Sequence, residues 1–265
     1  MTSVLFIIIG MTSGILAVMF GFGGGFFIVP ILYWAFQYLN ISTDLLMHMA
    51  VGTSLFVMIF TACNSSYFHY KKGSILWEPF FKLLPSMMIG TLIATFLSTK
   101  LNSQYLRYAF TFYLFYIIIS GLYKHLKHDK TSFASFVMPS QGITHVFGCS
   151  VGLIATLLGI GGSTLTVPFF RKYNLPLIKA VGTATLLSLP ISCIGTLGYL
   201  IVSFKLPNLP CYSTGYIYWP AAVGLILGSF MGVPVGGRLV YAIKEEWHTP
   251  CYFFILSIVF ITMIV

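Results

Sequence analysis

Two glycine-rich segments hold the residues of this chain whose types and spacing could bind a ligand. They read Gly21-Phe-Gly-Gly-Gly25 and Gly159-Ile-Gly-Gly-Ser163, and each lies inside an otherwise apolar run. Glycine permits positive φ and lets a ligand approach the backbone closely. A helix that restarts after such a break presents unpaired N–H groups and the positive end of its dipole. Two such ends could hold an anion without a buried Arg or Lys, and the expected amide donors are Gly23, Gly24, Gly25, Gly161, Gly162 and Ser163.

Hydroxyl groups near the start of the following apolar runs form the second set of candidate ligands. Thr53 and Ser54 in one half, and Thr183 in the other, could cap a helix or donate to an anion. Farther along the same runs, polar side chains recur at helical spacing. Such stripes are typical of a hydrophilic path and equally of interhelical hydrogen bonds, and their members are Thr61, Asn64 and Ser65, then Thr185, Ser188, Ser192 and Thr196.

The acidic, histidine and cysteine residues argue against other kinds of site. All five acidic residues lie near the ends of apolar runs, which disfavours a carboxylate proton relay or a site for a hard cation. Gly148-Cys-Ser-Val-Gly152 fits the G-x-S-x-G pattern without the strand-turn-helix context that this motif needs. We therefore expect no enzyme, no metal site and no cofactor. Two alternatives remain open: an intramembrane enzyme using Ser150 and His145, and a metal or cation permease using His48, His69 and the cysteines.

The composition fixes the class of protein. Of 265 residues, 58% are hydrophobic and 7% are charged, and apolar runs long enough to span a bilayer recur along the whole chain. We therefore expect an all-α polytopic membrane protein with the lipid bilayer as a partner. The net charge of +9 is scattered through short loops, which is typical of membrane orientation and not of nucleic-acid binding.

The glycine segments belong to a longer internal repeat. Residues 14–30 and 152–168 share seven of 17 positions at an offset of 138, including Val-Pro at the end, and Ala50-Val-Gly-Thr53 recurs as Ala180-Val-Gly-Thr183. Close helix packing at small residues could explain one segment, but duplication in register favours a binding site. Pro30 and Pro168 are expected to kink the returning helix or mark its first turn. The repeats are residues 1–126 and 139–265, joined by a cytoplasmic linker at 127–138.

Lysine and arginine positions distinguish two topologies. The first apolar run, about residues 3–39, would form a helix of about 55 Å, too long for a hydrocarbon core of about 30 Å. If each broken run crosses once, the 14 Lys and Arg divide seven to seven between the two sides; if each is a hairpin, they divide eleven to three. The positive-inside rule favours the hairpins. We therefore predict two inverted repeats, each a broken hairpin plus about three transmembrane helices, with both termini on the non-cytoplasmic side.

The doubled motif resembles the sulfite exporter TauE/SafE family. The resemblance rests on the stretch ending Phe-Phe-Ile-Val-Pro30 with Ala-Val-Gly-Thr-Ser54, on their second copies, and on His69-Tyr-Lys-Lys-Gly73-Ser-Ile75. It implies a bacterial-type inner-membrane permease for small anions, chiefly sulfite, organosulfonates or related sulfur oxyanions. We expect a secondary transporter that works by alternating access around a site near the midplane. Ser163 departs from the first copy, which has Gly25. The direction of transport, a coupling proton or ion, and the oligomeric state stay open.

Overall fold

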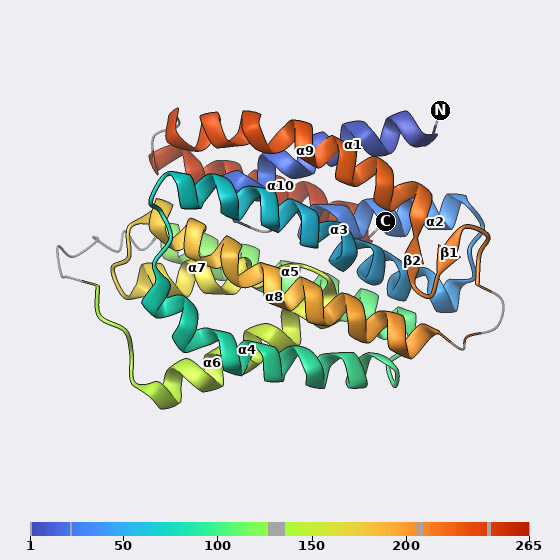
Figure 1. Ribbon diagram of the computed structural model, residues 1–265, viewed down its shortest axis with the longest axis horizontal. Helices are drawn as coiled ribbons and strands as arrows, with labels where there is room; N and C mark the ends of the chain where they lie inside the picture. The colour runs from blue at the N-terminus through green and yellow to red at the C-terminus, as the bar shows by residue number, and fades with distance from the viewer. Residues whose placement is uncertain are drawn as a thin grey trace.

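Helices make up almost the whole chain, as the composition predicts. The computed structural model describes residues 2–21, 23–126, 136–204, 206, 209–242 and 245–264. Figure 1 shows the helices running along one long axis, with a small hairpin of strands at one end. The elements of the described chain are α1 (Thr2–Phe20), α2 (Gly25–Tyr38), α3 (Thr43–Lys71), α4 (Trp77–Ser98), α5 (Ser103–Leu126), α6 (Gln141–Leu158), α7 (Ser163–Lys172), α8 (Leu177–Ser203), β1 (Ser213–Thr214), β2 (Ile217–Tyr218), α9 (Trp219–Ala242) and α10 (Glu245–Ile264).

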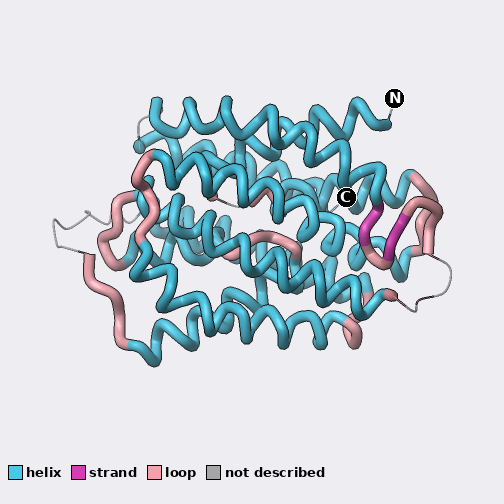
Figure 2. The backbone as a smooth tube through the Cα atoms, in the orientation of Figure 1, coloured by secondary structure: helices cyan, strands magenta, loops and turns pink. Residues whose placement is uncertain are grey.

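The first apolar run of each half is broken at its glycine segment, as predicted. Glycines adopt left-handed φ values at both places, for example 85° at Gly24 and 66° at Gly159, and a side chain would be strained there. Figure 2 draws loop segments within the bundle as well as at its two ends. Pro30 and Pro168 each occupy the sixth position of the helix after the break, so they lie beyond the first turn, where each removes one intrahelical hydrogen bond.

The structure contains enough long apolar helices for a multi-pass membrane protein. Within the described residues, six helices are long and apolar enough to cross a bilayer, namely α3, α4, α5, α6, α8 and α9. Three shorter apolar segments accompany them, at Val4–Phe20, Gly25–Tyr38 and Pro250–Ile264. Large apolar side chains on the outer helices are exposed, as at Phe96 and Phe112, which suits a surface in contact with lipid.

Helices of one half pack mainly against helices of the other half. The centre of the bundle is the pair α3 and α8, one from each half. α1 packs along α9 of the other half, and α6 packs along α4 in the same manner. α2 lies on α3, α7 lies on α8, and α5 contacts α10. The main contacts of one half therefore have counterparts in the other, and neither half is a separate packing unit.

Glycines allow these helices of different halves to pack with their backbones in direct contact. A Cβ atom at Gly152 of α6 would lie 2.1 Å from the Met87 carbonyl oxygen of α4, and one at Gly232 of α9 would lie 2.0 Å from the Met11 carbonyl oxygen of α1. Small residues at membrane helix contacts permit this kind of packing. The contacts advance in the same direction along both helices, since Gly10 lies against Leu225 and Gly14 against Ser229. α1 and α9 are therefore parallel.

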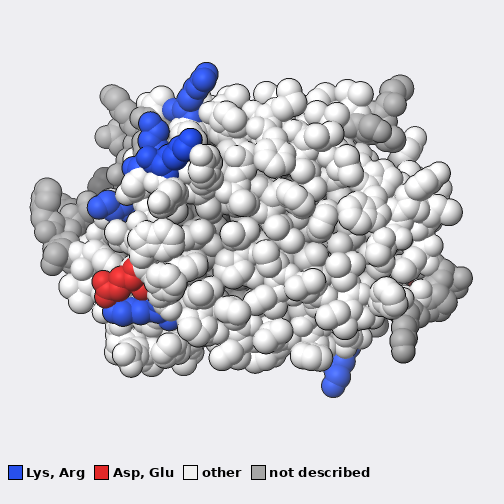
Figure 3. Space-filling view, viewed as in Figure 1, with Lys and Arg blue, Asp and Glu red and all other residues white. Residues whose placement is uncertain are grey.

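Charge divides the two ends of the bundle. On the face drawn in Figure 3, most Lys and Arg side chains gather at the left end, and one basic side chain projects from the lower edge, right of the centre. Figure 1, in the same orientation, marks both chain termini toward the right. Most of the predicted linker, residues 127–135, lies outside the described residues.

Replacing Gly152 by Ala should lower the thermal stability of the protein in detergent, because the added Cβ would meet the Met87 carbonyl. Overpacking of this kind costs about 1–3 kcal/mol, and the melting temperature of the purified protein measures it. Gly142→Ala in the same helix is the matched control, since a Cβ at Gly142 meets no atom within 4 Å. An equal fall in melting temperature for both variants would contradict the packing role of Gly152.

Candidate functional site

The two breaks touch each other at the centre of the bundle. A Cβ atom at Gly25, the first residue of α2, would lie 2.3 Å from the carbonyl oxygen of Gly159, the residue after α6. Real side chains do not come so close, so the contact requires glycine at position 25. The breaks are therefore adjacent in space although they are more than a hundred residues apart in the chain.

The hydroxyl of Ser54 joins the two breaks. Its Oγ lies 3.0 Å from the carbonyl oxygen of Gly159 and 3.3 Å from that of Gly25, and it can donate to either. Ser54 is fully buried in α3. On the other side of the first break, the Ser13 hydroxyl of α1 donates to the Gly24 carbonyl at 3.3 Å. The Gly159 carbonyl follows the last turn of α6, where carbonyls have no intrahelical donor, so Ser54 supplies one, while the Gly24 carbonyl also accepts the N–H groups of Phe27 and Ile28.

The central helices of both halves line the breaks. Gly21 lies against the Thr185 hydroxyl, and Gly23 against Ser188 and Met58. A Cβ at Gly162 would meet Ile191 of α8 at 3.1 Å. The polar stripe predicted on α8 therefore begins at the first break. Its hydroxyls are bonded within their own helix at Thr185, Ser188 and Ser192.

The breaks present unused hydrogen-bond donors. Among the described residues, no main-chain hydrogen bond uses the N–H groups at the starts of α2 and α7, at Gly23, Gly24, Gly25, Gly161, Gly162 and Ser163. The Ser163 hydroxyl is fully buried and also lacks a partner there. The next side chain, Thr164, shares a hydrogen bond with the hydroxyl of Tyr113 on α5. A buried donor without an acceptor is costly, so these groups favour a ligand that accepts hydrogen bonds.

Charged side chains lie away from the breaks. In the part of the chain that the structure describes, they lie within about two turns of a helix end or in the connections, as at Asp44, Lys71, Glu78 and Lys172. The ion pair between Lys82 and Glu78 is at the exposed start of α4. The electrostatic field at the breaks therefore comes from main-chain dipoles and hydroxyl groups. The potential of the main-chain dipoles is positive at a helix N-terminus.

The structure brings together most of the predicted site residues and sets two apart. The glycines, Ser54 and Ser163 belong to the two breaks. Thr53 instead donates to the carbonyl of Tyr216 and accepts from the N–H of Tyr218, at 3.2 and 3.1 Å. Thr183 accepts from the N–H of Leu76 at 3.0 Å. Both hydroxyls hold connections of the opposite half.

Sequence reasoning passed over three residues of the break region. Gly21 and Gly159 adopt positive φ and pack against the opposite half, and their duplication at an offset of 138 was the signal for them. Ser13 belongs to the same region through its bond to Gly24. No pattern in the sequence distinguishes Ser13 from any other serine of an apolar helix.

Comparison with known proteins gives this geometry a context. A model of the family "Sulfite exporter TauE/SafE" matches residues 6–263 of the chain. The chain belongs to this family. It is 28% identical over 230 residues to a "Probable membrane transporter protein" of Haemophilus influenzae, covering 87% of this chain and 86% of that protein. It is 30% identical over 238 residues to a "Probable membrane transporter protein" of Methanocaldococcus jannaschii, covering 87% and 81%.

A third TauE/SafE relative covers almost the whole chain. The "Probable membrane transporter protein YunE" of Bacillus subtilis is 26% identical over 280 residues, with 98% of this chain and 95% of that protein covered. No solved structure matches significantly. The family and these relatives make this protein a multi-pass membrane transporter, and they confirm the expectation that it is not an enzyme.

The residues of the enzyme and metal alternatives do not form sites in this TauE/SafE protein. Ser150 is exposed on α6 and donates to the Val146 carbonyl of its own helix at 2.9 Å. His48 and His69 contact the carbonyls of Ser98 and Val18. The described part of the chain holds no group of three or more His, Cys, Asp or Glu residues that could bind a metal.

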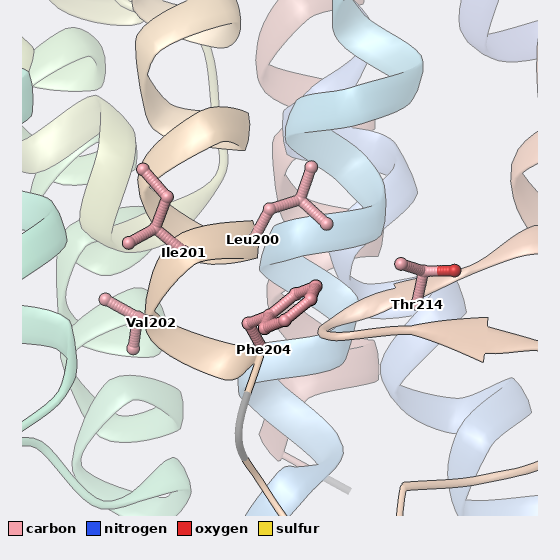
Figure 4. A pocket seen from close by; sticks show the side chains of 5 residues that line it. All are labelled: Leu200, Ile201, Val202, Phe204 and Thr214. Atoms are coloured by element: carbon pink, nitrogen blue, oxygen red, sulfur yellow. The ribbon is translucent and has the colours of Figure 1, made fainter.

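A surface hollow lies at the far end of α8 from the breaks. It measures about 540 Å³ and is lined by Leu200, Ile201, Val202, Phe204 and Thr214. Figure 4 shows three apolar side chains from the last turn of α8, Phe204 just after it, and Thr214 from the strand hairpin beside them. Leu200 is twelve residues beyond Ser188, which is about 18 Å along a helix. This apolar hollow is therefore separate from the transporter's break region.

Replacing Ser54 by Ala should destabilise the contact between the breaks, because both carbonyls lose their shared donor. A hydrogen bond between membrane helices contributes about 1 kcal/mol, so the melting temperature in detergent should fall by a few degrees. Ser150→Ala is the control, because that hydroxyl is exposed and bonded only within its own helix. If both variants melt alike, Ser54 does not join the breaks.

Proposed function

We propose that the protein is a secondary transporter for small anions, with sulfite, organosulfonates or related sulfur oxyanions as substrates, bound between the two breaks near the membrane midplane. One observation carries the proposal: the start of α2 packs on Gly159, four residues before α7 begins, and the starts of both helices carry unused N–H donors, with a buried, unpartnered hydroxyl at Ser163. Membership of the sulfite exporter TauE/SafE family supports the substrate class.

The chemistry of the donors favours an anion of low charge. Each helix N-terminus contributes roughly half a positive charge, concentrated in its first turn. Main-chain amides and a hydroxyl match oxygen acceptors, as at other anion sites on helix N-termini. A site without Arg or Lys also avoids holding its ligand as an ion pair. Such binding is favourable enough to capture an anion and weak enough to release it, as transport requires.

The packing supports inverted repeats. α1 is parallel to α9, and α6 is parallel to α4, since Gly148 lies against Ser86 and Gly152 against Met87. In Figure 1, α9 starts from the strand hairpin at the right and α4 starts from the connection after α3 at the left. α4 and α9 are therefore opposed, and so are α1 and α6. These relations are those of two hairpins that enter the membrane from opposite faces.

The distribution of charge supports an orientation. The basic end in Figure 3 corresponds to the cytoplasmic side by the positive-inside rule. Both termini are marked toward the other end in Figure 1. We therefore assign the termini to the non-cytoplasmic side of a bacterial-type inner membrane.

The close contact of the breaks supports alternating access. With Gly25 packed on the Gly159 carbonyl, an anion of several atoms cannot lie between them, so binding must separate the breaks. One break belongs to each repeat, and rocking of one repeat against the other would open the site from one face at a time.

Gly25→Ser should reduce anion flux at least tenfold, because the new side chain collides with the Gly159 carbonyl and changes how the breaks meet. Ser163→Gly makes the reciprocal change, removing the free hydroxyl without adding bulk. Loss of one hydrogen bond of about 1 kcal/mol should raise the KM for sulfite about fivefold. Sulfite and sulfonate uptake into proteoliposomes measures both effects. Wild-type flux and KM in both variants would refute the assignment of the site.

Substrate anions should stabilise the wild-type protein in detergent, because only the folded state binds them. At 100 times the dissociation constant, binding contributes about 2.7 kcal/mol. Melting temperatures with sulfite, a sulfonate, chloride and zinc, at constant ionic strength, make the comparison. Stabilisation by zinc and not by the sulfur oxyanions would favour the cation permease instead.

A further inference from the structure

The repeated Ala-Val-Gly-Thr motifs hold matching tripeptides of the opposite half. Gly52 and Thr53 of α3 contact Tyr216-Ile-Tyr218, which precedes α9, and Gly182 and Thr183 of α8 contact Ser74-Ile-Leu76, which precedes α4. We name these two contacts the first latch and the second latch. Each joins the third helix of one repeat to the segment that precedes the fourth helix of the other.

The two latches share the same geometry. A Cβ at Gly52 would lie 2.8 Å from the Tyr216 Cβ, and one at Gly182 would lie 2.8 Å from the Ser74 carbonyl oxygen. The absence of a side chain at Gly52 and Gly182 therefore allows each tripeptide to pack directly against α3 or α8. The next residue of the motif then accepts a main-chain N–H, from Tyr218 at Thr53 and from Leu76 at Thr183.

The middle residue of each tripeptide is a buried isoleucine. Ile217 is 1% exposed in the first latch and Ile75 is 8% exposed in the second. The tripeptides are connections between helices, and such segments ordinarily run over the surface. Burial of an isoleucine together with a bonded N–H fixes both connections against the central helix pair.

The latches lie at opposite ends of the bundle, on either side of the breaks. Figure 1 places the strand hairpin of the first latch at the right and the connection between α3 and α4 at the left. The residue after Thr53 is Ser54, which bonds both breaks. Two residues after Thr183, the Thr185 hydroxyl lies 3.0 Å from a Cβ built at Gly21. Each latch therefore covers one approach to the breaks.

The geometry points to Thr53 and Thr183 as positioning residues that close the two gates of the transporter. Resting on the proposed alternating access, this inference gives the motif a role in conformation and not in substrate contact. Opening the site toward one face requires that the threonine on that face release its tripeptide. Both threonines are bonded in this structure, so both gates are closed.

Thr53→Val and Thr183→Val test the latches by removing one hydroxyl each without changing side-chain size. Cysteine reporters are placed at the buried isoleucines, as Ile217→Cys or Ile75→Cys, after the five native cysteines have been replaced. The rate of labelling by a methanethiosulfonate reagent in detergent measures the open fraction of each latch. Each reporter is compared with and without the valine substitution, so that the reporter's own effect cancels.

Thr53→Val should raise the labelling rate of Ile217→Cys at least about fivefold, because losing one hydrogen bond has about that effect and Thr53 makes two, and it should leave Ile75→Cys unchanged or slower. Thr183→Val should do the reverse. General destabilisation would instead expose both reporters in both variants, and that result would overturn the inference, as would no change at either reporter. The control Thr99→Val should affect neither reporter, because Thr99 is exposed just after α4 and its hydroxyl donates only to the Phe96 carbonyl of that helix.

Labelling needs no substrate, so the two proposals can fail separately. Selective labelling in a protein that carries no anion would retain the latches and reject the anion transporter. Anion flux in a protein whose labelling does not respond would retain the transporter and reject the latches.

Discussion

A backbone-to-backbone contact between two interrupted helices organises this protein. Gly25 packs on the Gly159 carbonyl, and Ser54 places one hydroxyl between the carbonyls of both. Only a residue without a side chain allows this approach. The central pair α3 and α8 lies against the breaks on either side, and the outer helices are arranged around that pair.

The contact also explains how a chain with few charges can present a polar centre inside a membrane. A buried Arg or Lys would need a partner or a water-filled cavity. An interrupted helix supplies partial charges from the backbone itself, and the carbonyl that follows α6, at Gly159, accepts a hydrogen bond from Ser54. The surplus N–H groups keep their capacity to donate. The same interruption thus produces the fold's central contact and its candidate site.

Local features of the sequence predicted the breaks well. The run before Tyr38 is too long for one crossing, and glycine and proline act on the backbone where they occur, so α1 and α6 end at the expected places. The hydrogen-bond partners of the serine and threonine hydroxyls could not be predicted from such local features. Ser54 and Thr53 are adjacent and of similar chemistry, yet one bonds the breaks and the other bonds the strand hairpin. Partners of this kind depend on which helix lies opposite, and the repeat pattern alone does not specify that.

The packing of helices from one half against helices of the other has a consequence for biogenesis. α1 presents Gly10 and Gly14 to α9, yet α9 begins at Trp219. At about 5–20 residues per second, synthesis of the intervening chain takes roughly 10–40 s. During that time the glycine face of α1 must be covered by lipid or by the insertion machinery. The first half therefore cannot complete its packing while it is being made, and α1 reaches its final contacts only after α9 has been synthesised.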